Sequence, residues 1–151
     1  VDVMEHEVKN IVRMVRAFKR MAQTAKEHGV QLVIEPLNSL VDHKGIWLTT
    51  LAQAMDIVEE VDSPNVKILC DLYHQQVTEG NLIANLTRYA PWIGHLHAAG
   101  VPGRHELVGG ELDYRAILAA IKKTSYTGYV GLEFLPTLGE EAALKQAQTL
   151  L

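Results

Sequence analysis

The sequence predicts an α/β fold in which helices cover a parallel sheet. Short, continuous apolar runs rich in β-branched residues recur along the chain, and segments with helical spacing of apolar residues separate them. Hydrophobic residues make up 48% of the 151 positions, which is enough for the core of one domain. No linker or low-complexity tract divides the chain, so we expect residues 1–151 to form a single unit.

The first half of the chain predicts two helices and two strands. Apolar side chains recur every three or four residues over residues 2–28, and Gly29 then provides a stop signal for the helix. The next run, VQLVIEPLN, has the length and composition of a buried strand that ends near Pro36. Helical spacing returns over residues 50–61, and the run VKILCDLYH is the second strand candidate.

The second half repeats this alternation. Residues 81–90 predict a short helix with Asn81 as its N-cap, and WIGHLHAAG is the third strand candidate. Asp113 is expected to cap a helix that ends near Lys123. GYVGLEFLP is the fourth strand candidate, and residues 139–151 form the last helix. A helix followed by four strand–helix units fits either a doubly wound open sheet or a (β/α)8 barrel.

Each predicted strand ends near a side chain that can bind a metal ion: Glu35, Asp71, His97 or Glu133. The carboxyl ends of parallel strands lie on one rim, where the active sites of such folds form. Three carboxylates and one imidazole suit Mg²⁺, Mn²⁺ or Co²⁺ better than a structural zinc site. Any of the four alone fits an ordinary cap or salt bridge, but burying all four together is costly without a compensating cation.

Two further residues are candidates for substrate binding. His74 lies three positions after Asp71, and Arg104 lies in the glycine-rich loop VPGRHELVGGELDY that follows the third strand. The loop is expected to carry Arg104 over the rim, where a guanidinium can bind a substrate oxygen, with His105 and Glu106 holding the loop in place. The alternative is an ordinary solvated loop.

Composition restricts the classes of partner. Fourteen basic and 18 acidic side chains give a net charge of −4, which argues against binding to nucleic acid or to a membrane surface. No apolar run has the length of a membrane span, and the N-terminal residues lack the pattern of a signal peptide. With Cys70 as the single cysteine, a reducing cytoplasmic location is expected.

The segments IEPLNS, CDLYHQQ, IGHLHAAGVPGRHE, GGELDY and GYVGLEFLPT closely resemble the hydroxypyruvate isomerase branch of the xylose isomerase-like barrels. Sugar epimerases belong to the same superfamily. The resemblance implies a (β/α)8 TIM barrel about twice as long as this chain, of which residues 1–151 would be the C-terminal half. Two open sheet edges would then require a homo-oligomer or a missing N-terminal half.

The resemblance also implies the chemistry. One divalent metal ion would be bound by Glu35, Asp71, His97 and Glu133, with Glu35 and Glu133 doubling as the catalytic proton-transfer pair. The substrate would be a small sugar or keto acid such as hydroxypyruvate, isomerised through a cis-enediolate.

Three points leave the activity and the substrate open. Return of the proton to the same carbon would make the protein a ketose 3-epimerase instead. A half-barrel without its partner would be a non-catalytic fragment. Leu40 stands where the isomerase branch often has an arginine, which removes one partner for a substrate carboxylate.

Overall fold

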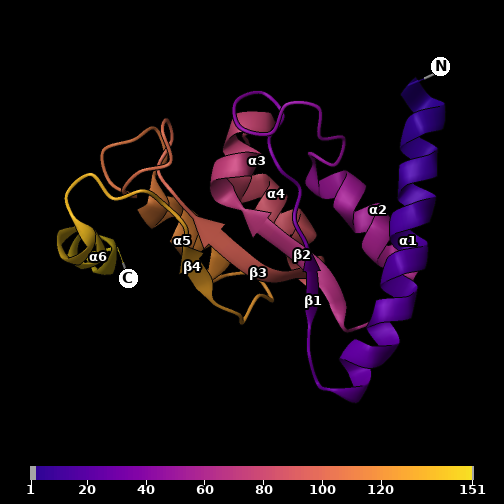
Figure 1. Ribbon diagram of the computed structural model, residues 1–151. Helices are drawn as coiled ribbons and strands as arrows, with labels where there is room; N and C mark the ends of the chain where they lie inside the picture. The colour runs from indigo at the N-terminus through magenta and orange to yellow at the C-terminus, as the bar shows by residue number, and fades with distance from the viewer. Residues whose placement is uncertain (1–2, 151) are drawn as a thin grey trace.

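The structure, a computed structural model, describes residues 3–150 and contains one sheet of four parallel strands (Figure 1). The strands are β1 (Leu32–Ile34), β2 (Val66–Asp71), β3 (Ile93–Ala98) and β4 (Val130–Leu132). They lie side by side in the order of the chain, β1-β2-β3-β4. A doubly wound sheet reverses its order at a switch point, so this unbroken order confirms the barrel arrangement.

The helices follow the strands as predicted, with one addition. They are α1 (Val3–Glu27), α2 (Leu51–Val61), α3 (Leu72–Thr78), α4 (Leu82–Tyr89), α5 (Tyr114–Ile121) and α6 (Glu140–Gln148), with a short 3₁₀ turn, η1 (Ala90–Trp92). α1 and α6 lie at opposite ends of the molecule (Figure 1). Among the described residues, no helix has both the length and the apolarity needed to cross a membrane.

The two faces of the sheet differ: one packs against the helices in the core, and the other carries polar side chains. Val66, Ile68 and Cys70 of β2 are fully buried in the core shared with the helices, as are Leu96 and Ala98 of β3. Fully burying a valine, isoleucine or leucine side chain contributes about 1.5–3 kcal/mol. The intervening residues point to the other, inner face, because successive side chains alternate along a strand. Asp71 and His97 belong to this inner set, and Glu35 and Glu133 directly follow β1 and β4.

Capping explains where several helices begin and end. The Thr50 side chain accepts a hydrogen bond from the Gln53 backbone in a capping box at the start of α2. Asp113 caps α5 as predicted, with Oδ1 accepting from Ala116 N at 3.1 Å. Gly29, with a φ of 64°, ends the first helix as predicted, since its left-handed conformation favours glycine.

Two sequence predictions need correction in detail. The run VKILCDLYH is not a single strand, because α3 begins at Leu72, directly after β2. Asp71 turns the chain by accepting a hydrogen bond from Tyr73 N at 2.8 Å. Asn81 is the N-cap residue of α4, as predicted, but it adopts a left-handed conformation with a φ of 50° and makes no side-chain capping bond.

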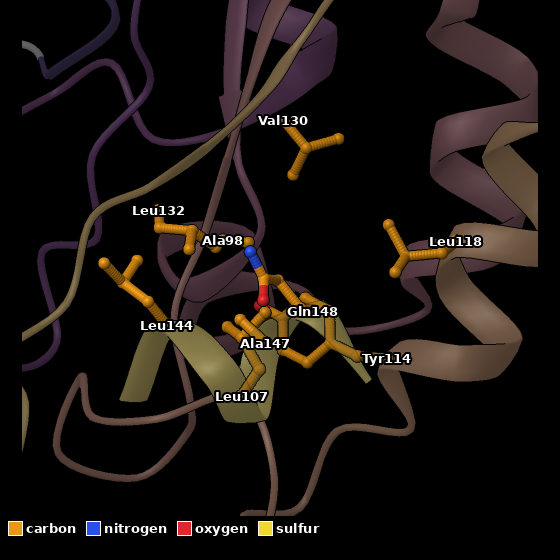
Figure 2. Close-up of a pocket in the computed structure, with 9 residues that line it drawn as sticks. All are labelled: Ala98, Leu107, Tyr114, Leu118, Val130, Leu132, Leu144, Ala147 and Gln148. Carbon is orange, nitrogen blue, oxygen red and sulfur yellow. The ribbon is translucent and has the colours of Figure 1, made fainter. Parts of the chain in front are cut away.

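An apolar cavity of about 250 Å³ lies on the helix-covered side, between β3, β4, α5 and α6 (Figure 2). Tyr114, Leu118, Val130 and Leu144 are among its lining residues. None of the predicted metal ligands lines it. The cavity is therefore separate from the polar rim at the strand ends.

Candidate metal centre and active site

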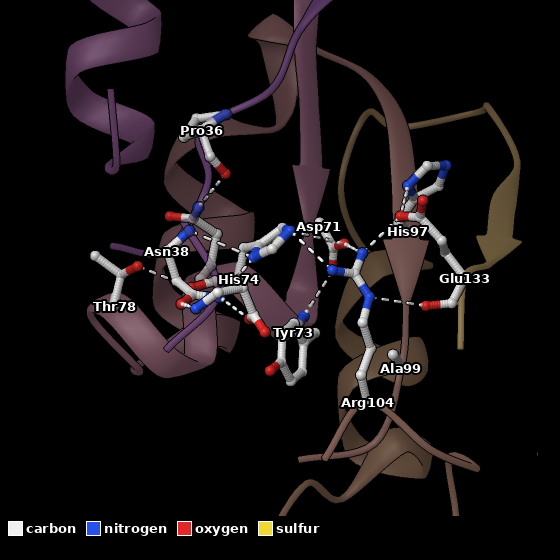
Figure 3. Close-up of polar contacts among 12 residues, drawn as sticks. Pro36, Asn38, Asp71, Tyr73, His74, Thr78, His97, Ala99, Arg104 and Glu133 are labelled. Atoms are coloured by element: carbon white, nitrogen blue, oxygen red, sulfur yellow. Dashed lines mark hydrogen bonds and ion pairs between the residues drawn. The ribbon is translucent and has the colours of Figure 1, made fainter. Parts of the chain in front are cut away.

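The four predicted metal ligands meet at the carboxyl end of the sheet. Asp71 is the last residue of β2 and His97 lies one residue before the end of β3, while Glu35 and Glu133 directly follow β1 and β4. One ligand atom from each lies within 4.8 Å of those of the other three. Asp71, His97 and Glu133 converge from their separate strands in Figure 3. The structure thus brings together the whole predicted set.

Asp71 is the most constrained of the four. Its side chain is fully buried, and its Oδ1 is occupied by the Tyr73 backbone N–H that starts α3. Oδ2 is thereby left facing the other ligands. Burial raises the pKa of the Asp71 carboxyl, while the neighbouring Arg104 guanidinium acts in the opposite direction.

The donor atoms of the site suit a divalent cation. Glu35 Oε1 is buried and has no hydrogen-bond partner, and burial together with the charges of Asp71 and Glu133 raises the pKa of Glu35 to about 6. His97 Nδ1 lies 2.8 Å from Glu133 Oε2 without a hydrogen bond between them, so two atoms of kinds that bind metal ions lie close together there. A hard cation compensates such a concentration of oxygen and nitrogen donors, so these residues fit a divalent metal ion.

Arg104 reaches the same site from the loop after β3 (Figure 3). Its Nη2 donates to Asp71 Oδ2 at 2.6 Å and to Glu133 Oε2 at 2.7 Å, and its Nε donates to the Glu133 carbonyl at 3.1 Å. Burial raises the pKa of Glu133, but Arg104 and then His97 outweigh it and hold that pKa below its usual value. The sequence correctly predicted that Arg104 lies over the rim. It did not predict the direct contact of Arg104 with two of the metal-type ligands.

The Arg104 loop is joined to the segment after β4, as expected for His105 and Glu106. Leu135 N donates to the Arg104 carbonyl at 2.8 Å, and His105 Nδ1 lies 2.9 Å from the Leu135 carbonyl. Arg104 itself has a φ of 59°, a conformation that this pairing maintains.

Glu106 fixes the two segments to each other. Its carboxylate accepts hydrogen bonds from the backbone N–H groups of Thr137 and Leu138, at 2.6 and 2.9 Å, and from the Thr137 hydroxyl at 2.9 Å. The bond from Leu138 is the main cause of a pKa lowered to about 2. Glu106 is therefore an ionised clamp that holds the Arg104 loop beside Glu133.

His74 lies beside the metal-type ligands and is almost fully buried. Its Nε2 is 3.0 Å from Arg104 Nη1 and 3.8 Å from Asp71 Oδ2. On the other side of the ring, Nδ1 contacts Asn38. Burial is the first cause of a pKa lowered to about 4, and Arg104 adds to it. His74 is therefore neutral near pH 7.

Asn38 is the functional residue that sequence reasoning missed. It is fully buried four residues beyond the end of β1 and lies between His74 and the turn that follows. Only its place in the segment IEPLNS, directly after a strand that carries a metal-type ligand, pointed to it.

Comparison with known proteins identifies relatives that share this fold. A family model described as the xylose isomerase-like TIM barrel matches residues 4–151. The hydroxypyruvate isomerase of Escherichia coli is 36% identical over 132 residues, which cover 87% of this chain and 51% of that protein. The 2-oxo-tetronate isomerase of Cupriavidus necator is 37% identical, covering 82% of this chain and 47% of that protein.

Solved structures agree in fold. A protein from Brucella melitensis described as a family 2 AP endonuclease superposes with a TM-score of 0.82 at 32% identity, over 86% of this chain and 50% of that one. A 3-keto-D-glucoside 4-epimerase from E. coli superposes with a TM-score of 0.79 at 29% identity, over 90% and 51%. The chain spans about half the length of the curated relatives it matches.

Proposed function

The chain belongs to the xylose isomerase-like TIM barrel family, and from that premise we propose that it carries the metal-binding and proton-transfer residues of an isomerase. The substrate class is a small hydroxy-carbonyl compound such as hydroxypyruvate. The observation that carries the proposal is the convergence of Glu35, Asp71, His97 and Glu133 at the ends of four consecutive strands. The names of the isomerases from E. coli and C. necator support the reaction class.

The ligand set would hold one divalent cation, Mg²⁺, Mn²⁺ or Co²⁺. Bound there, the cation would supply Lewis-acid polarisation of a carbonyl and an adjacent hydroxyl oxygen, which makes the proton on the hydroxyl-bearing carbon more acidic. Asp71 and His97 come from the two central strands, and Glu35 and Glu133 come from the two outer ones. The two glutamates therefore approach the site from opposite sides.

Glu35 and Glu133 would move the proton. One carboxylate removes the proton from the hydroxyl-bearing carbon, and the electron pair of the broken C–H bond forms the carbon–carbon double bond of a cis-enediolate. A glutamate then returns a proton to the neighbouring carbon, and the hydroxyl proton passes to the former carbonyl oxygen, which completes the exchange of the carbonyl and hydroxyl positions. Glu35 Oε1 has no protein hydrogen bond to break before it acts.

His74 and Arg104 would orient the substrate. Both present nitrogen donors at the rim, and Arg104 already bonds the two carboxylates Asp71 and Glu133. A substrate oxygen offers the same kind of acceptor to these groups. Tyr73 supports the guanidinium from one side, with its ring centre 4.9 Å from the Arg104 Cζ.

The activity test uses the 151-residue chain loaded with Mn²⁺ or Mg²⁺ and incubated with hydroxypyruvate in D₂O. Proton NMR would follow both isomerisation and exchange of the substrate C–H proton. We expect both in the wild-type chain and neither in Glu133→Gln, with Glu141→Gln on the exposed face of α6 as a matched control. Exchange that persists in Glu133→Gln would remove Glu133 from the proton-transfer pair.

We also propose that the four strands act as one half of a barrel, completed by a second copy of this chain or by an N-terminal half. The extent of the matches to the isomerases supports this. If the loaded chain binds metal but neither isomerises nor exchanges protons, completion of the barrel by a second copy of this chain is ruled out. Restoration of activity by a separately produced N-terminal half of a relative would then support the half-barrel arrangement.

A ketose 3-epimerase is the second candidate. The 29% identical E. coli structure carries an epimerase name, and the same pair of glutamates suffices when the proton returns to the original carbon from the other face. A ketohexose assay run beside the hydroxypyruvate assay separates the two reactions. Turnover of the ketohexose alone would favour the epimerase.

A further inference from the structure

We propose that Asn38 is a positioning residue that holds His74 in the tautomer with its proton on Nε2. His74 then acts toward the substrate only as a hydrogen-bond donor. The substrate part of this inference rests on the proposed function, whereas the tautomer itself follows from the contacts around the ring.

Two donors of Asn38 converge on one ring nitrogen. The backbone N–H of Asn38 donates to His74 Nδ1 at 3.3 Å, and its side-chain Nδ2 lies 2.7 Å from the same atom (Figure 3). Both residues are buried, with 0% and 1% of their surface exposed. A nitrogen that faces two N–H groups away from water has to be the acceptor of the ring.

The Asn38 amide cannot present its oxygen to His74 instead. Its Oδ1 accepts from Val41 N at 3.0 Å and from Asp42 N at 3.1 Å, and Nδ2 also donates to Asp42 Oδ2 at 2.7 Å. Rotating the amide would replace these bonds with contacts between like partners. The turn over residues 38–42 therefore fixes the orientation of the amide.

A neutral imidazole has one acceptor and one donor nitrogen, so a proton-free Nδ1 places the proton on Nε2. The ring is also held in place by the rings of His43 and Tyr73, which contact it edge to face with centroid distances of 5.3 and 5.4 Å. A doubly protonated ring does not fit, because Nδ1 would then present an N–H group to the two donors of Asn38.

The Nε2–H group then faces Arg104 Nη1 at 3.0 Å, and Asp71 Oδ2 is 3.8 Å away, beyond hydrogen-bond distance. Arg104 can only donate, so it competes with Asn38 for the one acceptor nitrogen of the ring. Asn38 prevails because it brings two donors to Nδ1 and is fully buried in a fixed turn, whereas the Arg104 side chain is 21% exposed. The Nε2–H and Arg104 Nη1 groups are then two neighbouring donors that one oxygen can accept from. In the proposed reaction, a substrate oxygen takes that place. The proton-free nitrogen of His74 points away from the rim, so His74 cannot remove the substrate proton and this step is left to the glutamates.

The tautomer can be read directly by NMR. The 151-residue chain, labelled with ¹⁵N in histidine, would be measured without metal at neutral pH, and the His74 signals would be assigned from their loss in His74→Gln. We expect the wild-type ring to carry its proton on Nε2. In Asn38→Asp, a carboxylate oxygen replaces the amide donor, and we expect the proton to move to Nδ1. Asn65→Asp, which lies before β2 at the opposite end of the sheet, is the matched control and should leave the His74 signals unchanged.

A wild-type ring protonated on Nδ1, or one that exchanges between both tautomers, would overturn the inference. So would an Asn38→Asp variant with an unchanged His74 signal. If Asn38→Asp does not fold, the wild-type spectrum still decides. The measurement needs neither metal nor substrate, so an Nε2–H tautomer in a chain that stays inactive even with an N-terminal half added would refute the proposed function and leave the role of Asn38 standing.

Discussion

Replacing Tyr114 by phenylalanine tests how the fold holds the strand end that carries His97. The Tyr114 hydroxyl donates to the Ala99 carbonyl at 2.7 Å and accepts from the Ala99 N–H at 3.0 Å. Both residues are buried. Ala99 lies between β3 and the Arg104 loop, so this one hydroxyl satisfies the backbone at the junction of the two site elements.

The structure sets the size of the effect. Phenylalanine fills nearly the same space, so the loss is electrostatic: a donor and an acceptor of Ala99 are left buried without partners. Each such group costs about 1–3 kcal/mol, which gives about 2–6 kcal/mol for the pair. Because a folded domain is stable by about 5–15 kcal/mol in total, the variant loses a large share of its stability.

Urea unfolding followed by circular dichroism measures this loss. The matched control is Tyr126→Phe, whose hydroxyl donates a single bond at 2.6 Å to the Tyr129 carbonyl at an exposed position. We expect the control to lose about 1 kcal/mol or less and to keep the same dependence on urea concentration. If Tyr114→Phe is no less stable than Tyr126→Phe, the reasoning about the Ala99 backbone is refuted.

Three further perturbations test the site. In the wild-type chain the Arg104 guanidinium occupies oxygens of Asp71 and Glu133 that a cation would use, and Arg104→Met frees them. In calorimetric titration this variant should bind Mn²⁺ at least about tenfold more tightly than wild type. Weaker binding would contradict a competition between the guanidinium and the cation. The folded-state pKa of Glu106 is lowered from 4.5 to about 2, so its contribution to stability is present above about pH 4.5 and is lost as the pH falls toward 2. Glu106→Gln should therefore flatten this part of the acid-unfolding curve. An unchanged dependence of stability on acid would argue against the role of Glu106 in holding the two segments together. Gly131→Ala places a methyl group 2.9 Å from His97 Cδ2, so it should weaken Mn²⁺ binding by displacing the imidazole, whereas unchanged affinity would show that the ring can move without cost.

The sequence predicts the metal-type ligands well because they obey a rule of the fold. Glu35, Asp71, His97 and Glu133 each follow or end an apolar run, and parallel strands deliver such positions to one rim. The same rule holds for Arg104, which lies in the loop after the third run. The local sequence pattern is sufficient to predict such a site because each strand–helix unit brings its strand-end residue to the same rim.

Features that depend on contacts between distant segments could not be predicted in this way. The apolar run at Asp71 shows no periodicity that separates strand from helix, and only the cap that this side chain forms reveals the start of α3. Asn38 acts on His74, which lies 36 positions away, and nothing in its own segment indicates that contact. The strands β1 and β4 are also shorter than their apolar runs, since they end at Ile34 and Leu132, just before Glu35 and Glu133.

The claim that the four strand-end side chains form one metal site is tested most directly by counting bound Mn²⁺ after equilibrium dialysis. We expect one ion per wild-type chain and loss of that ion in Asp71→Asn. Asp113→Asn, an exposed change at the cap of α5, should retain it. Absence of bound Mn²⁺ in the folded wild-type chain, or equal binding by Asp71→Asn, would contradict the account.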